Sequence, residues 1–452
     1  MLGLCFVGIR GRLASKSPIR IGTAYFCNNA FLNQLGLNPN FVLLNTTLDA
    51  KKDKNKQLKL MSEDEAIRKV REYLNIVDTE PDSPIARNVE PQQAEKKKNI
   101  VLILMESMAA SHLEDSGKNN LPFLQSLRQR SIYFSNFYSG GIHTFNGIYS
   151  TLFSYPALLN RHSFKSGEIQ NYACLPAVLK ENGYKTLYFS THDDQFDNIG
   201  GYLAANQVEK IVAQKDYPEK EVLSNLGVPD DFMFRFSMDI LRNIAGNSPF
   251  FATYLTASNH PPYIVPEYYH SEKEKTEDRI LEYTDWALSQ FFEMAKKESW
   301  YENTIFILTG DHGAATDFLY DVSLAYHHIP LFIFDPGNEE GKIIENVGCQ
   351  LDIFPTIMGM LGLQYRNNTF GIDLLHENRP YAFFSSDNSY ECIDREWYYV
   401  HRNDRRESLY QLTDKEGTDR ITTYPAIADS MRQYVESMIQ AAQYLIRVNK
   451  VK

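Results

Sequence analysis

A chain of 452 residues with 43% hydrophobic side chains is long enough to form a large α/β domain and one smaller unit. Its formal net charge of −11 argues against a protein that binds nucleic acid. The five cysteines lack CxxC and metal-ligand spacing, which argues against a disulfide framework and a zinc knuckle. No apolar run reaches the ~20 residues that a membrane-spanning helix needs. Residues 1–9 are apolar and precede several basic residues, which is typical either of the remnant of a membrane region or of an apolar start to the chain.

The N-terminal part is predicted to be a lead-in segment, residues 1–76, followed by a linker, residues 77–98. Ser62 and Glu65 have the spacing of a capping box, and apolar residues at helical spacing follow them, which predicts a helix over residues 63–75. The linker is predicted because this stretch contains three prolines and many charged residues.

Residues 99–378 are predicted to form the catalytic domain, because strand and helix patterns alternate along them. The expected strands lie at residues 99–105, 131–138, 185–190, 250–256, 304–309 and 330–334. The expected helices lie at residues 120–130, 145–152, 175–182, 275–297 and 351–361. This alternation is typical of an α/β fold with a mostly parallel central sheet and helices on both faces.

From residue 379 the pattern changes, and residues 379–452 are predicted to form a small C-terminal unit of antiparallel strands and a helix. Three short strands are expected at residues 381–384, 397–400 and 409–412. A closing amphipathic helix is expected over residues 424–448. Pro425 is tolerated at its start because the first turn needs no amide donor there.

Two of the predicted strands end in acidic residues that are candidate ligands of one metal ion. One apolar strand stops at Gly310, and Asp311 and His312 follow it. The first strand of the domain leads directly into Glu106. Ligands bind at the carboxyl ends of strands in open α/β sheets, and carboxylates and imidazoles are strong metal ligands. Taken alone, the Gly310–Asp311 pair is equally typical of a surface turn.

A glycine-rich segment between these strands ends in a threonine at a predicted helix start. Gly140 and Gly141 precede Thr144, whose hydroxyl is expected at a helix N-terminus, where unpaired amides and the helix dipole stabilise an anion. Thr144 is therefore a candidate nucleophile or phosphate-binding residue, and a simple N-cap is the alternative. The neighbouring His143 is predicted to be a loop residue rather than a ligand.

Five motifs occur in one order along the chain: NIVLILMES, GGIHTFNG, SNHPPY, TGDHG and LDIFPTIMGMLG. Together they resemble the alkaline phosphatase superfamily, and within it the sulfatase-domain proteins of the lipoteichoic acid synthase and phosphoethanolamine transferase type. The resemblance covers about residues 99–412. It implies an alkaline-phosphatase-like α/β fold and an enzyme that acts on phosphoric or sulfuric esters.

The resemblance also implies that Glu106, Thr144, Asp311 and His312 bind one divalent metal and that Thr144 is the nucleophile. Three oxygen ligands and one imidazole suit Mn²⁺, which we favour, or Zn²⁺ or Mg²⁺, and the pattern leaves room for a second metal. True sulfatases mature a Cys or Ser in a C/S-x-P-x-R pattern to an aldehyde. Thr144 stands at that position here and cannot form the aldehyde, so sulfate-ester hydrolysis is not expected.

Four further histidines are candidate catalytic or substrate-binding residues, and a structural role is the alternative for His260 and His192. His260 in SNHPPY matches a position that contacts the substrate phosphate or the leaving group in related transferases. His192 follows a strand end, and the resemblance suggests that it contacts the head group. One of His327 and His328, with His327 preferred, is a candidate acid, phosphate ligand or second-metal ligand. Asp352 is expected to order the fold near the site.

These expectations lead to a metal-dependent transferase that moves phosphoglycerol or phosphoethanolamine from a phospholipid through a Thr144 adduct. Its partners would be a phospholipid head group at a membrane surface and a cell-envelope glycan or polymer. By analogy with these relatives, the chain is expected to be the catalytic part of a membrane-anchored protein, in the periplasm or on the outer face of the cell membrane. A phosphodiesterase or phosphatase is the first alternative, and a non-catalytic glycan- or lipid-binding domain is the second.

Overall fold

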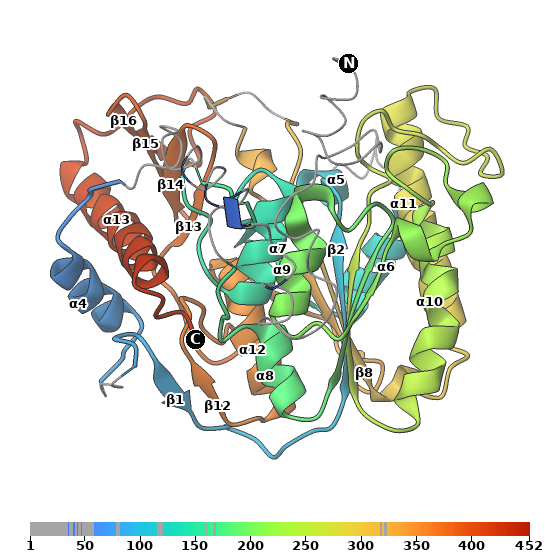
Figure 1. Ribbon diagram of the computed structural model, residues 1–452. Helices are drawn as coiled ribbons and strands as arrows, with labels where there is room; N and C mark the ends of the chain where they lie inside the picture. The colour runs from blue at the N-terminus through green and yellow to red at the C-terminus, as the bar shows by residue number, and fades with distance from the viewer. Residues whose placement is uncertain are drawn as a thin grey trace.

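The computed structural model describes residues 58–77, 82–114, 121–159, 161–165, 169–316, 319–320 and 323–452, together with five isolated positions before residue 58. The apolar start at residues 1–9 and most of the predicted lead-in segment lie outside these described residues. Figure 1 shows a central sheet between helices, with a smaller sheet and a long helix at its flank. Within the described part of the chain, no helix combines the length and the apolar character needed to cross a bilayer.

The central sheet has eight strands in the order β10-β3-β9-β8-β2-β7-β5-β6. All of them run parallel except β9, which is antiparallel to both of its neighbours. The strands are β2 (Asn99–Met105), β3 (Ile132–Phe134), β5 (Lys185–Ser190), β6 (Lys210–Val212), β7 (Phe250–Leu255), β8 (Thr304–Gly310), β9 (Leu331–Phe334) and β10 (Lys342–Ile344). The predicted α/β class with a mostly parallel sheet is confirmed.

Strand β2 is buried on both faces, which explains why it is a continuous apolar run rather than an alternating one. Ile100 and every second residue after it point into one hydrophobic core. Val101 and every second residue after it point into another core on the opposite face of the sheet. One face is covered by α7 (Thr144–Phe153), α8 (Leu175–Glu181), α9 (Ile199–Ala205) and α12 (Ile353–Leu361), and the other by α6 (Pro122–Arg130), α10 (Asp230–Ala245) and α11 (Thr276–Ala295).

The described part of the N-terminal segment is tied to the rest of the fold. Helix α4 (Glu63–Tyr73) begins at the predicted capping residue, because the Ser62 hydroxyl accepts a hydrogen bond from the Glu65 amide at 3.2 Å. Strand β1 (Arg87–Val89) lies within the predicted linker and pairs with β12 (Tyr365–Asn367). Part of the linker is therefore built into a small sheet, while the domain boundaries themselves stay predictions.

The predicted strand over residues 131–138 is divided in the structure. After β3, strand β4 (Phe137–Tyr138) leaves the central sheet and pairs with β11 (Gly348–Cys349). At the break, the side-chain amide of Asn136 donates to the Glu345 carbonyl at 2.7 Å. After this break the chain forms β4 and then enters the glycine-rich segment that precedes Thr144.

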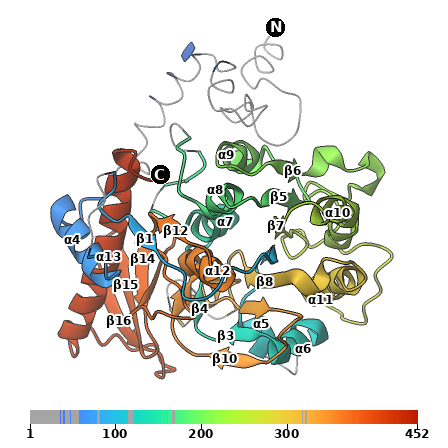
Figure 2. The same ribbon diagram turned by 90° about the horizontal axis from the view of Figure 1, so that it is seen from below.

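The C-terminal unit is an antiparallel sheet of four strands together with one helix, and that helix packs beside α4 (Figure 2). The elements are β13 (Ala382–Ser385), β14 (Ser389–Ile393), β15 (Trp397–Arg402), β16 (Glu407–Gln411) and α13 (Pro425–Arg447). Strand β14 is not among the strands predicted from sequence, because the buried polar residues Ser389 and Glu391 interrupt its apolar pattern.

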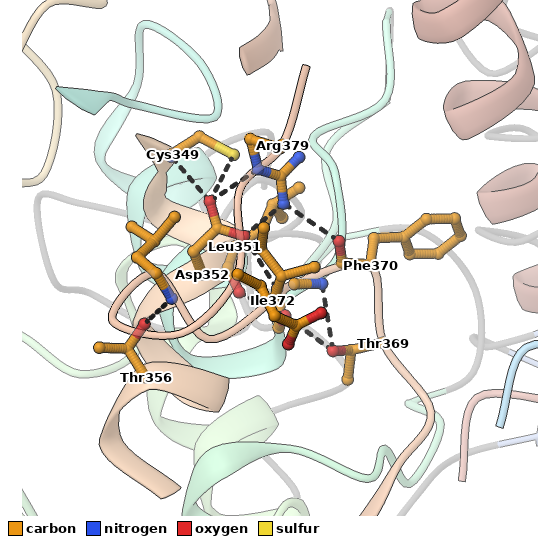
Figure 3. A network of polar contacts seen from close by, with 12 residues as sticks. Cys349, Leu351, Asp352, Thr356, Thr369, Phe370, Ile372 and Arg379 are labelled. Atoms are coloured by element: carbon orange, nitrogen blue, oxygen red, sulfur yellow. Dashed lines mark hydrogen bonds and ion pairs between the residues drawn. The ribbon is translucent and has the colours of Figure 1, made fainter. Parts of the chain in front are cut away.

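Asp352 joins this unit to the α/β domain through a buried polar network, drawn in Figure 3. Its carboxylate accepts hydrogen bonds from the Arg379 guanidinium, which lies in the segment before β13. It also accepts from the backbone amides of Cys349 at 2.9 Å and Ile372 at 3.0 Å. Arg379 donates in addition to the Tyr434 hydroxyl of α13 at 3.1 Å. The expectation that Asp352 orders the fold is therefore confirmed.

Candidate active site

The carboxyl ends of β2 and β8 bring three candidate ligand side chains together. The two strands pair along their whole length, with Met105 opposite Gly310, so the residues that follow them emerge side by side. Glu106, Asp311 and His312 are buried, and each offers a ligand atom within 4.8 Å of the other two. The His312 Nε2 atom lies 3.7 Å from Glu106 Oε1 and 3.7 Å from Asp311 Oδ2.

Hydrogen bonds orient Asp311 and His312. The Oδ1 atom of Asp311 accepts from the backbone amides of Ser107 at 2.9 Å and His312 at 2.7 Å. The Nδ1 atom of His312 lies 2.7 Å from the Gly313 carbonyl oxygen, and a proton at Nδ1 leaves the Nε2 lone pair facing the two carboxylates. The second oxygen of Asp311, Oδ2, is buried and has no hydrogen-bond partner among the described residues.

The charges around Glu106 favour a cation at this position. Burial, and then repulsion by Asp311, raise the pKa of Glu106 well above its ordinary value. The hydroxyl of Ser107, which donates to Glu106 Oε1 at 2.8 Å, opposes that rise. A divalent cation fits this donor set, because it would satisfy the unpartnered carboxylate oxygen and offset the repulsion between the two carboxylates.

Thr144 lies beside the same group of side chains. It is the first residue of α7, and its hydroxyl donates to Glu106 Oε2 at 3.4 Å. Gly147 lets the first turn of α7 lie directly against β8, because a Cβ atom at this position would be 2.1 Å from the Asp311 carbonyl oxygen. The four residues predicted to bind a metal therefore lie in one place, although metal binding itself stays a prediction.

Two buried amide side chains that the sequence analysis does not single out hold the segments of the site together. Gln350 donates from Nε2 to the carbonyl oxygens of Gly310 and Asp311, at 2.9 and 2.8 Å. Its Oε1 atom accepts from the Gly140 amide at 2.8 Å. Asn259 donates to the two backbone carbonyls that follow β2, both at 3.3 Å. The only signal in the sequence is that these residues lie beside or within the LDIFPT and SNHPPY motifs.

Two of the predicted site histidines follow strands at the same edge of the sheet. His260 is exposed and lies next to Asn259. Its Nδ1 atom is 2.6 Å from the Pro261 carbonyl oxygen, which leaves the Nε2 atom available to contact a substrate. His192 is 8% exposed, and its Nδ1 lies 2.6 Å from the Ser190 hydroxyl at the end of β5. Strand β7 separates β5 from β2, so His192 lies farther along the edge than His260 does.

His327 and His328 differ in their surroundings. His327 is 0% exposed, and its Nε2 atom lies 3.0 Å from the Ser386 hydroxyl. Burial, with a contribution from the nearby His312, lowers the pKa of His327 to about 3, so this imidazole is neutral. The Nε2 atom of His328 faces the Ser135 carbonyl at 2.7 Å. The roles of both histidines stay predictions.

Comparison with known proteins agrees with this fold. The sequence profile of the sulfatase family matches residues 98–363. The chain is 26% identical over 428 aligned residues to the lipoteichoic acid synthase of Staphylococcus aureus, with 87% of this chain and 63% of that protein covered. It is similar to the crystal structure of a protein in the alkaline phosphatase superfamily from Vibrio parahaemolyticus, with a TM-score of 0.78, 23% identity and coverage of 87% of this chain and 98% of that chain. It is also similar to the crystal structure of a lipoteichoic acid synthase from Listeria monocytogenes, with a TM-score of 0.69 and 20% identity. That match covers 84% of this chain and 98% of the other chain.

The fold resembles that of a protein in the alkaline phosphatase superfamily, and the site holds a buried group of Glu106, Asp311 and His312 that could bind a metal ion. Since the family profile covers more than half of the chain, the protein belongs to the sulfatase family and is an enzyme that acts on phosphoric or sulfuric esters. The chain spans 63% of the length of the curated relatives that it matches.

Proposed function

We propose that this protein is a metal-dependent phosphotransferase that moves phosphoglycerol or phosphoethanolamine from a phospholipid to an extracytoplasmic acceptor. The observation that carries the proposal is the Thr144 hydroxyl at a helix N-terminus, 3.4 Å from Glu106 Oε2 and beside the buried Asp311 and His312. The curated relatives, which are lipoteichoic acid synthases, support a donor from the cell envelope. Thr144 stands where sulfatases carry a modified Cys or Ser, which favours a phosphoric ester over a sulfuric ester.

One divalent metal would be held by Glu106, Thr144, Asp311 and His312. Three oxygen donors and one imidazole, with no thiolate among them, favour Mn²⁺. When bound, this metal would lower the pKa of the Thr144 hydroxyl and polarise the phosphoryl oxygen of the substrate.

Thr144 would act as the nucleophile of a two-step transfer. In the first step, its Oγ1 atom forms a bond to phosphorus while the bond between phosphorus and the alcohol of the lipid breaks. The Thr144 proton passes towards Glu106 Oε2, and the leaving alcohol takes a proton from His260 or from water. In the second step, an acceptor hydroxyl forms a bond to phosphorus while the bond between phosphorus and Thr144 Oγ1 breaks. The acceptor proton passes to His260 or to water, and Glu106 returns the first proton to Thr144 Oγ1.

The remaining histidines would bind the substrate around this centre. His260 and His192, which follow β7 and β5, would contact the phosphate and the head group of a donor that enters from the carboxyl edge of the sheet. Such a donor sits in a lipid layer, so the proposal places the site at a membrane surface on the extracytoplasmic side.

Intact-mass spectrometry tests this function directly. The Mn²⁺-loaded protein is incubated with vesicles of phosphatidylglycerol or of phosphatidylethanolamine. We expect a head-group adduct on the wild-type protein, whose mass identifies the donor, and no adduct on Thr144→Ala. Thr422→Ala, which changes an exposed threonine of the C-terminal unit, is the matched control and should carry the same adduct as the wild type.

The other outcomes lead to different functions. An adduct that persists on Thr144→Ala would show that another residue is the nucleophile. Hydrolysis of phosphodiesters that requires Thr144 but leaves no adduct would favour a phosphodiesterase with water as the acceptor. A protein that binds Mn²⁺ but converts no phosphoric ester would overturn the proposal in favour of a binding domain.

A further inference from the structure

The turn between β13 and β14, residues 385–388, lies against the segment that carries the candidate nucleophile. This 385–388 turn belongs to the C-terminal sheet and lies outside residues 98–363, the part of the chain that the family profile matches. None of its residues is among the site residues predicted from sequence. The segment that it touches, residues 139–143, leads directly into Thr144 and is called the nucleophile loop below.

Two contacts join the turn to the nucleophile loop. The Ser385 amide donates to the Gly140 carbonyl at 3.1 Å, and Ser385 forms an isolated parallel bridge with Gly141. The Oδ1 atom of Asp387 lies 2.8 Å from Nε2 of His143, the residue directly before Thr144. The turn therefore holds the loop both at its glycines and at its last residue.

A third contact runs through the protein interior. The Ser386 hydroxyl donates to Glu391 Oε1 at 3.1 Å and lies 3.0 Å from His327 Nε2. Because a serine has one hydroxyl hydrogen and donates it here to the carboxyl group, its oxygen accepts the Nε2–H of His327. Glu391 and His327 are 0% exposed and Ser386 is 6% exposed, so this chain of hydrogen bonds is shielded from solvent.

His327 connects that buried chain to the nucleophile loop. Its backbone carbonyl accepts from the Ser139 amide at 2.8 Å. Its ring stacks on Phe384 of β13, with the centroids 4.0 Å apart. A fully buried imidazole that is held by a hydrogen bond and a stacked ring is suited to a positioning role, beside the roles of acid, phosphate ligand or second-metal ligand expected from sequence.

We propose that the 385–388 turn, with Ser386 at its centre, is a positioning element that sets the nucleophile loop, and through it Thr144, relative to Glu106. The inference rests on the proposed function of that site. The turn contacts both the loop and His327, so the proposed role is the alignment of Thr144. A misplacement of ~1 Å can lower a rate by ~10²-fold, so the loss of one contact should lower kcat rather than raise KM.

Steady-state kinetics of the full chain with Mn²⁺ and bis-p-nitrophenyl phosphate test the proposal. We expect Ser386→Ala to lower kcat by about 10- to 100-fold, because a misplacement of the nucleophile by ~1 Å can cost ~10²-fold, with little change in KM. Ser386→Thr keeps the hydroxyl and should recover most of the lost rate. Ser437→Ala is the matched control, because Ser437 is a buried serine of the same unit whose hydroxyl donates to the Tyr434 carbonyl at 2.8 Å, and it should keep the wild-type kcat.

The proposal is overturned if Ser386→Ala and Ser437→Ala have the same kcat, or if the loss is not recovered by Ser386→Thr. It is also overturned if the loss follows a matching fall in melting temperature. Thr144→Ala tests the proposed function separately. If this variant turns over substrate like the wild type, Thr144 is not the nucleophile and the proposed function fails. In that case the electron paramagnetic resonance spectrum of bound Mn²⁺ tests whether the 385–388 turn positions the site. A spectrum that differs from the wild type in Ser386→Ala but not in Ser437→Ala supports the inference. Identical spectra in both serine variants overturn it.

Discussion

Glu391 is an ionisable side chain within the core of the C-terminal sheet. Burial raises its pKa to about 7, although the hydroxyls of Ser389 and Ser386 donate to it. In the unfolded chain the same carboxyl group loses its proton near its ordinary pKa of 4.5. Between these two values the folded state binds more protons than the unfolded state. The contribution of Glu391 to the free energy of unfolding is therefore fully present below pH 4.5, and it is lost as pH rises through about 7.

Replacing Glu391 by glutamine should remove this pH dependence. We expect the free energy of unfolding of Glu391→Gln, relative to the wild type, to increase by up to about 3 kcal/mol between roughly pH 5 and pH 8. Denaturant unfolding of both proteins at the two pH values measures the change. Glu416→Gln, at an exposed glutamate, is the control and should show no such trend. A difference that stays constant with pH would contradict the prediction.

Asp311 should stabilise the protein only when a metal is bound. Without a cation, its charge opposes that of Glu106 within a buried site, so Asp311→Asn should unfold in EDTA at the same temperature as the wild type or higher. With free Mn²⁺ at roughly 100 times its dissociation constant, the wild type should gain about 2.7 kcal/mol, and the variant should gain much less. Thermal unfolding in EDTA and in Mn²⁺ measures both effects. An equal gain for both proteins would show that Asp311 is not a ligand.

At the scale of elements, the position of α7 decides where Thr144 lies. The helix approaches the Asp311 backbone closely because Gly147 has no side chain. In Gly147→Ala the new Cβ atom would lie 2.1 Å from the Asp311 carbonyl oxygen, so the helix must move. We expect a loss of about 1–3 kcal/mol in stability and a lower kcat.

A glycine in open surroundings provides the control for that variant. A Cβ atom at Gly246, the residue that ends α10, would meet no atom within 4 Å. Gly246→Ala should therefore leave both stability and kcat close to those of the wild type. Denaturant unfolding and turnover are measured on both variants. If Gly147→Ala behaves like Gly246→Ala, the close packing of α7 on β8 does not position the nucleophile.

The elements that were predicted best are those buried on both faces. Strands β2 and β8 were predicted to within one residue because a fully buried parallel strand is a continuous apolar run. Strand β14 was missed because it includes the buried Glu391, whose carboxyl group accepts hydrogen bonds from Ser386 and Ser389 rather than from solvent. The break between β3 and β4 was missed for a related reason, since Asn136 gains its partner from a distant segment.

At the scale of the whole molecule, the ion pair of Arg379 and Asp352 joins the C-terminal unit to the α/β domain. Both side chains are buried, and the same guanidinium reaches the Tyr434 hydroxyl of α13. Removing one partner of a buried pair leaves the other charge without compensation, so Arg379→Met should destabilise the protein by about 3–5 kcal/mol. Arg395→Ala, which breaks an exposed pair with Glu345, should have an effect below about 1 kcal/mol.

A double variant tests whether the loss at Arg379 comes from the unpaired charge. Adding Asp352→Asn to Arg379→Met removes the carboxylate that the first substitution leaves behind. We expect the double variant to lose less stability than the sum of the two single variants, as measured by denaturant unfolding. Simple addition of the two losses would show that the pair does not couple the unit to the domain.

The amino-acid sequence by itself indicated the fold class and a shared sheet edge for Glu106, Asp311 and His312, while the resemblance implied that Thr144 joins them. Parallel strands align their carboxyl ends, so residues that follow two buried apolar runs must meet at one edge of the sheet. Only the tertiary structure decided what holds that edge together. Gln350 bonds to a residue 210 positions away, and the 385–388 turn reaches the nucleophile loop from a separate sheet. Such contacts depend on how distant segments pack, and hydrogen bonds between distant residues leave no periodic pattern in the local order of amino acids.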